Sequence, residues 1–132
     1  MFFKILSFFG LNKNRGKIYK GIRGEQIAEK YLKQKGFKIL KKNFRVKGGE
    51  ADLIAQFCEK IVVVEVKLRT TKQFGTPHSA VDRRKFKRLL LAGTIYCRKR
   101  NFSTKNLRID IVSIEMNNDD LKIQHFENVN LL

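Results

Sequence analysis

The chain has 132 residues, of which 42% are hydrophobic and one is proline, so it is expected to form one globular domain and not a disordered chain. Its 29 lysines and arginines outnumber 12 acids and give a formal net charge of +17, which favours polyanionic partners, nucleic acid first and an anionic membrane surface second. Two cysteines exclude a disulfide framework and indicate a reducing cytoplasm.

The positive charge is concentrated in the first hundred residues. Residues 101–132 carry three bases and five acids, which leaves 26 bases and 7 acids in residues 1–100. We therefore expect a binding face built from the first three quarters of the chain.

Residues 1–17 are expected to be a basic, aromatic tail before a single domain over residues 18–132. Lys4 interrupts the apolar stretch at the start and no small-residue cleavage site follows, so a signal peptide is not expected. No run reaches membrane-spanning length, and stable membrane insertion is not expected. The phenylalanines of the tail leave a surface-lying anchor open, beside the simpler reading of a tail that packs on the domain or frays.

The first predicted element is a helix between Ile18 and Gly36. Apolar residues recur at helical spacing, and Gly36 stands where a C-cap is common. Three strand-like stretches rich in Ile, Val and Phe follow, at residues 37–46, 51–57 and 61–68.

The segment after the third strand breaks the pattern with Gly75 and Pro77. Ser79, with Asp82 three residues on, resembles a capping box and predicts the start of a second helix. The predicted apolar face of this helix is Phe86, Leu89, Leu90, Gly93, Tyr96 and Cys97. Two last strands are predicted at residues 107–114 and 121–126.

Charged residues interrupt the third strand. A side-chain period of two puts Glu65 and Lys67 on one face with Ile61 and Val63, and the intervening valines on the other. Both faces are largely apolar, as in a central strand buried on both sides. Taken alone, a Glu-x-Lys on a strand is more often an edge-strand charge pair than a catalytic dyad.

The register of the hairpin decides what faces Glu65. A two-residue loop, Cys58-Glu59, puts Asp52 directly opposite Glu65, whereas a three-residue loop would put Asp52 beside Val66. We expect the two-residue loop because it clusters the charges. Two carboxylates about 4 Å apart repel by roughly 1 kcal/mol in water and about 4 kcal/mol at an effective dielectric of 20. Bound Mg²⁺ or Mn²⁺ would offset this repulsion, with Lys67 placed to orient an activated water.

Three other acids can have a simpler structural role in place of a role in the metal site. Glu25, at the edge of the first helix's apolar stripe, can overhang the sheet as a third carboxylate or pair with Arg23 or Lys20 on the helix surface. Glu50, beside two glycines, is interpreted as a loop carboxylate, and Asp110 as the partner of a neighbouring base.

Three bases are predicted to contact nucleic acid: Arg69, Lys85 and Arg88. Lys85 lies on the flank of the second helix's apolar face, although any one lysine among so many is usually a solvated charge. The runs DRRKFKR and RKRNF have the basic and aromatic content of a backbone-binding face.

The motifs GEQIAEKYL, GGEADLIA, VVVEVKLR and FGTPHSAVDRRKFKRL resemble the YraN-like family of small bacterial proteins. That family is similar to Holliday-junction resolvases and restriction-type nucleases of the PD-(D/E)XK superfamily. The resemblance covers roughly residues 18–114 and implies an α/β, restriction-endonuclease-like αβββαβ core with a mixed sheet flanked by helices. It implies that Asp52 is the metal-binding aspartate, Glu65 and Lys67 the E-x-K, and Glu25 the helix glutamate. Ala51 replaces the motif's proline and leaves the ligand set intact.

Two functions follow as expectations. The first is a Mg²⁺- or Mn²⁺-dependent endonuclease acting on DNA rather than RNA, with branched or structured DNA favoured and a homodimer left open as a way to cut two strands. The second is a nucleic-acid-binding module of the same fold that does not cut, associated with RNA or the ribosome. The set of Asp52, Glu65 and Lys67 favours activity, because a pure binder has little use for two close carboxylates facing a phosphate backbone. A membrane-surface adaptor is a more distant third.

Overall fold

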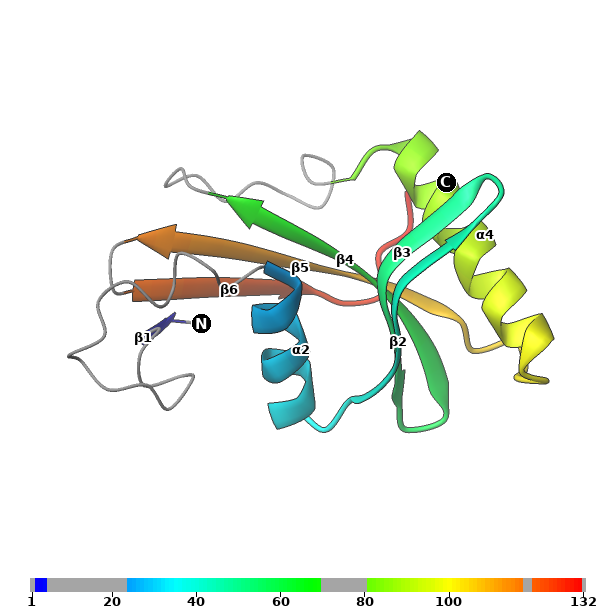
Figure 1. Cartoon of the computed structure of the whole chain (residues 1–132), viewed down its shortest axis with the longest axis horizontal. Helices are drawn as coiled ribbons and strands as arrows, with labels where there is room; N and C mark the ends of the chain where they lie inside the picture. Colours follow the sequence, from blue (N-terminus) through cyan, green and yellow to red (C-terminus); the bar gives the residue numbers. More distant parts are fainter. Residues whose placement is uncertain (1, 5–23, 70–80, 118–119, 132) are drawn as a thin grey trace.

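The structure, a computed structural model, describes residues 2–4, 24–69, 81–117 and 120–131 (Figure 1). These residues form two helices and six strands: β1 (Phe2–Lys4), α2 (Gly24–Gln34), β2 (Lys38–Val46), β3 (Gly49–Phe57), β4 (Lys60–Arg69), α4 (Arg83–Lys99), β5 (Arg108–Asn117) and β6 (Asp120–Phe126).

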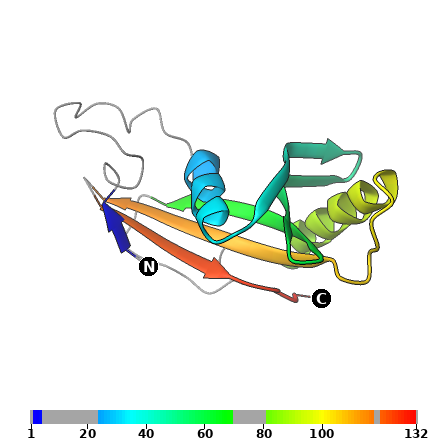
Figure 2. The same cartoon turned by 90° about the horizontal axis from the view of Figure 1, so that it is seen from below.

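The strands form one mixed sheet with the order β1-β6-β5-β4-β3-β2. β4 and β5 are parallel, and every other neighbouring pair is antiparallel. The predicted α/β class and αβββαβ order are confirmed, and the arrangement is consistent with a restriction-endonuclease-like core. Figure 2 shows the tip of the β2–β3 hairpin bending away from the long strands β4, β5 and β6.

β4 is buried on both faces because its residues alternate between two cores. Val62 and Val64 pack with α2 in one cluster. Ile61 and Val63 pack with α4 in the other. The helices therefore cover opposite faces of the sheet, and the predicted central strand is confirmed.

Close contact between α4 and the sheet depends on two glycines. A Cβ atom on Gly93 would lie 2.4 Å from Cγ2 of Val63, and one on Gly49 would lie 2.9 Å from the carbonyl oxygen of Arg88. Real Cβ contacts are longer, so a side chain at either position would push the helix away from β4 or β3. The approach at Gly49 brings the start of β3 next to the first turns of α4.

The helix starts differ in part from the expected ones. α4 begins after Asp82, whose side chain accepts a hydrogen bond from the backbone N–H of Lys85 at 2.8 Å. Asp82 is thus the N-cap itself, and the prediction that it is the third residue of a capping box is wrong. Ser79 lies outside the described residues, as do residues 18–23 of the first predicted helix.

The chain also forms a strand within the segment expected as a tail. Phe2–Lys4 pairs with β6 and forms one edge of the sheet. Residues 5–17, the remainder of the predicted tail after β1, lie outside the described part of the chain. No helix among the described residues is long and apolar enough to cross a membrane.

Candidate metal centre

The candidate centre lies where β3 separates from β4. The two strands pair from Phe57↔Lys60 to Leu53↔Val64, around the turn Cys58-Glu59. The predicted two-residue loop is therefore confirmed. Asp52 and Glu65 come directly after the last paired residues, Leu53 and Val64. At that level the Asp52 carboxylate accepts a hydrogen bond from the backbone N–H of Val66 at 2.8 Å. The carboxylate takes the place of a backbone partner as the strands diverge.

The other neighbour of β3 has an unusual backbone conformation at the same level. The pairing of β2 with β3 passes from Phe44↔Ala51 to Lys42↔Leu53. Between these pairs, Asn43 adopts a left-handed backbone with φ of 49°. A non-glycine residue in this conformation marks a special backbone geometry, often beside functional groups. Asp52 thus lies where the pairing of β3 with β4 has ended and level with a special backbone conformation in β2.

Glu65 is the most perturbed acid of the centre. The residue is only 9% exposed, and burial, followed by the charge of Asp52, raises the pKa of its carboxyl from 4.5 to about 7. Burial also raises the pKa of Asp52, against the hydrogen bond from Val66, and the charge of Glu25 adds to the rise. Two close, poorly solvated carboxylates cannot both ionise without cost.

The fit of a divalent cation can be judged from these atoms. Glu65 Oε2 is buried and has no hydrogen-bond partner among the described residues. A buried carboxylate oxygen without a partner is costly. Paired carboxylate oxygens are the ligands that hard cations such as Mg²⁺ and Mn²⁺ prefer. The donor set of Asp52 and Glu65 therefore fits such an ion.

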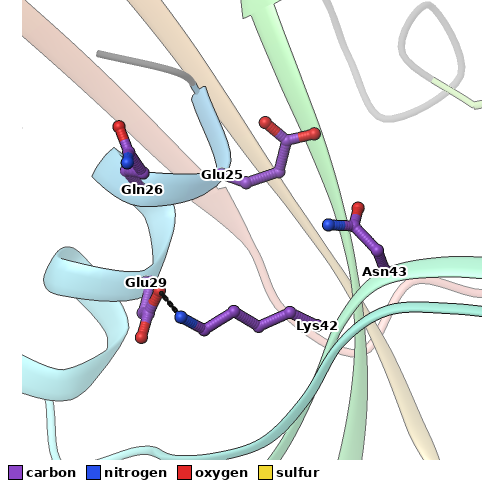
Figure 3. Close-up of a pocket in the computed structure, with 5 residues that line it drawn as sticks. All are labelled: Glu25, Gln26, Glu29, Lys42 and Asn43. Atoms are coloured by element: carbon purple, nitrogen blue, oxygen red, sulfur yellow. Dashed lines mark ion pairs between the residues drawn. The ribbon is translucent and has the colours of Figure 1, made fainter.

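Glu25 reaches the centre from the other helix. It lies in the first turn of α2, and its charge contributes to the raised pKa of Asp52. It also lines a pocket of about 240 Å³ between α2 and β2 with Gln26, Glu29, Lys42 and Asn43 (Figure 3). The alternative surface partners Arg23 and Lys20 lie outside the described residues.

The counter-charge nearest to Glu65 comes from α4. Lys85 Nζ lies 3.6 Å from Glu65 Oε1 and 2.5 Å from Glu50 Oε1. Arg88 Nη2 lies 3.9 Å from Glu50 Oε2. Glu50 belongs to β3, so its interpretation as a loop carboxylate is wrong. Its position two residues before Asp52, on the same face of a strand, is the signal that points to it.

The remaining predicted site residues follow Glu65 along β4. Lys67 is exposed and lies level with Ser113 of β5. Arg69 is half-buried at the end of the strand, where residues 70–80 leave the described part of the chain. The structure brings Asp52, Glu65, Glu25 and Lys85 together, and the catalytic and binding roles of the whole set stay predictions.

A second polar cluster lies on the α2 face of the sheet. Asp110, His125 and Glu127 place ligand-type atoms within 4.8 Å of one another, so they are a possible acidic and histidine metal group. Asp110 is fully buried. It accepts hydrogen bonds from Arg108 Nε at 2.9 Å and Nη2 at 2.8 Å, and from the backbone N–H of Asn128 at 2.9 Å.

The guanidinium of Arg108 already supplies the positive charge in this cluster. His125 Nε2 lies 2.7 Å from Asp110 Oδ2 and completes its set of partners. Burial opposes ionisation of Asp110, but the hydrogen bonds of His125, Arg108 and the Asn128 N–H together lower its pKa. The prediction that Asp110 pairs with a neighbouring base is confirmed. The cluster joins β5 and β6 to the segment that follows β6.

The family model and the curated relatives that match this chain agree on one family. The uncharacterised protein family UPF0102 matches residues 24–114. A UPF0102 protein of Caldanaerobacter subterraneus subsp. tengcongensis is 41% identical over 109 residues, 83% of this chain and 89% of that protein. A UPF0102 protein of Carboxydothermus hydrogenoformans is 36% identical over 109 residues, 83% of this chain and 92% of that protein. Among solved structures, SfsA of Pyrococcus furiosus in complex with Ca²⁺ is similar with a TM-score of 0.35 and 14% identity, over 78% of this chain and 60% of that one. The chain belongs to the UPF0102 family, the YraN-like family that its motifs resemble.

Proposed function

We propose that this protein is a metal-dependent endonuclease that hydrolyses phosphodiester bonds of DNA, with branched or structured DNA as its favoured substrate. The observation that carries the proposal is the pairing of half-buried Asp52 with buried Glu65, whose Oε2 has no hydrogen-bond partner among the described residues. A protein that only binds a polyanion has no evident use for two close, poorly solvated carboxylates.

Asp52, Glu65 and Glu25 would hold Mg²⁺ or Mn²⁺. When bound, such an ion polarises a phosphoryl oxygen and lowers the pKa of a bound water. The Val66 N–H holds the Asp52 carboxylate in place. Lys67, on the same face of β4 as Glu65, orients the attacking water or neutralises charge that develops on the phosphate. Placement on strands of a rigid sheet keeps these groups in register.

The formal charge of +17 supports a nucleic-acid partner. Arg69, Lys85 and Arg88 are proposed to contact phosphates next to the scissile bond. A homodimer would present two centres to two strands, as a branched duplex requires. Both cysteines are free, which supports the cytoplasm as the site of action.

A second function is supported by one observation. Lys85 already places a positive charge 3.6 Å from Glu65 Oε1. An internal cation of this kind would suit a nucleic-acid-binding module, of RNA or the ribosome, that keeps the fold without cutting.

A cleavage screen separates the two functions. The full chain is incubated with Mg²⁺ or Mn²⁺ and with single-stranded, duplex, flap and four-way DNA, and with the matching RNAs. We expect metal-dependent cleavage that is lost in Asp52→Asn and Glu65→Gln, while nucleic-acid binding is retained. Glu59→Gln, an exposed acid in the β3–β4 turn, is the matched control. Cleavage by an Asp52→Asn/Glu65→Gln double variant at the parent's rate would refute the proposed centre.

A further inference from the structure

The Lys85 ammonium occupies the side of Glu65 that faces α4. Oε1 of Glu65 lies 3.6 Å from Lys85 Nζ, whereas Oε2 is buried without a partner among the described residues. In this structure the centre is thus partly neutralised by a group of the protein itself. The same ammonium is bound more closely by Glu50, at 2.5 Å.

An ammonium and a divalent cation on one carboxylate repel each other. At separations of about 4 Å, even in water, each pair of unit charges interacts by roughly 1 kcal/mol, and a doubly charged ion doubles the effect. Lys85 therefore opposes binding of a metal ion by Glu65 as long as its ammonium stays there.

The Lys85 side chain can also move away from Glu65. Its side chain is 29% exposed and has four rotatable carbons, so the ammonium can leave Glu65 and keep its closer contact with Glu50. It stands in the first turn of α4 beside Arg83 and Arg84, at the helix end where the backbone dipole disfavours cations and favours anions. A phosphate that docks there relieves this repulsion and draws the ammonium outward.

We propose that Lys85, held by Glu50, couples the two ligands of the centre: it weakens metal binding in the free protein, and a nucleic-acid phosphate that engages it lifts this opposition. This inference rests on the proposed function and adds a regulation to it. Because coupling of two binding equilibria is reciprocal, the metal tightens nucleic-acid binding by the same factor. The free protein then holds little metal, and the loaded centre forms mainly on its substrate.

Calorimetry with Mn²⁺ tests the coupling on the full chain without a readout of cleavage. Each variant is titrated at about pH 8.5, above the pKa of Glu65, so that protons compete little. Titrations are repeated with a saturating short DNA duplex whose phosphodiesters are replaced by phosphorothioates, after subtraction of Mn²⁺ binding to the duplex alone. Urea unfolding of each variant checks that it is folded.

We expect Lys85→Gln to bind Mn²⁺ at least about tenfold more tightly than the parent without DNA, and DNA to tighten Mn²⁺ binding in the parent far more than in this variant. Glu50→Gln, which frees Lys85 for Glu65, should weaken Mn²⁺ binding. Lys87→Gln removes the same charge from an exposed position of α4 and should match the parent.

Two outcomes would overturn the inference, and only the second would also overturn the proposed function. If the parent binds Mn²⁺ and cleaves DNA but Lys85→Gln binds the ion no more tightly than Lys87→Gln does, the coupling is wrong and the nuclease stands. If neither parent nor variants bind Mn²⁺ and the parent does not cleave, both fail.

Discussion

Replacement of Glu65 by glutamine should stabilise the protein, although the residue is buried. The pKa of Glu65 is raised to about 7 in the folded state, whereas the unfolded chain releases this proton near its ordinary value. Between these values the folded protein keeps a proton that the unfolded chain has lost. The stability of the parent therefore falls as pH rises through this window, and glutamine removes that loss.

The size of the gain follows from the pKa shift. A rise from 4.5 to about 7, at about 1.4 kcal/mol for each unit, corresponds to roughly 3 kcal/mol at pH 8 and to little at pH 4.5. For a chain of this length that is about 10 °C in Tm. The pKa of about 7 already includes the charge of Lys85, which acts in the opposite direction.

The assay is urea unfolding of Glu65→Gln and the parent in metal-free buffer, at several values from about pH 5 to pH 8. The difference in the free energy of unfolding should grow with pH and level off above about pH 7. Glu59→Gln controls for loss of an acid from a basic protein, because Glu59 is exposed. A Glu65→Gln variant less stable than the parent at pH 8 would show that Lys85 outweighs burial and repulsion, and would refute the reasoning.

Asp110→Asn should cost about 3–5 kcal/mol of unfolding free energy, because the poorly solvated charge of Arg108 loses its close partner at 2.8 Å and keeps only the exposed Glu127 at 3.7 Å; a cost below about 1 kcal/mol in urea unfolding would contradict the role assigned to this cluster. Gly93→Ala should cost about 1–3 kcal/mol despite the better helix propensity of alanine, since its Cβ would lie 2.4 Å from Val63 Cγ2, and a raised Tm would count against this close contact. The affinity for duplex DNA should fall with salt at a slope near −4.5 on logarithmic axes if about five phosphates are neutralised; a salt-insensitive affinity would instead indicate stacking or a protein partner.

The central part of the site could be predicted because it depends on local geometry. A side-chain period of two, together with the two-residue turn at Cys58-Glu59, fixes which residue faces Glu65, and both are properties of a short stretch of sequence. The two apolar faces of β4 likewise identify it as a central strand. The pairing of Asp110 with Arg108, two residues before it on the same strand, is local in the same sense.

Features that depend on tertiary packing were not predictable. The contact of Lys85 with Glu50 and Glu65 joins residues of α4, β3 and β4, and it depends on how closely α4 approaches the sheet. His125 contacts Asp110 from β6, and the sequence of β6 alone does not predict this contact. β1 has three residues, too few for a periodic pattern to show.

The parallel pairing of β4 with β5 has a consequence for the order of folding. β2, β3 and β4 are joined by tight turns, whereas Val62 pairs with Arg108 only after the chain has passed through α4. Local hairpins close at small entropic cost, and the long crossover closes at a larger one. Asp52 and Glu65 therefore meet while still solvated, where their repulsion is weak, and are buried only when α4 and β5 dock. Their repulsion then acts mainly after the folding transition state, so Glu65→Gln should slow unfolding and leave the folding rate nearly unchanged.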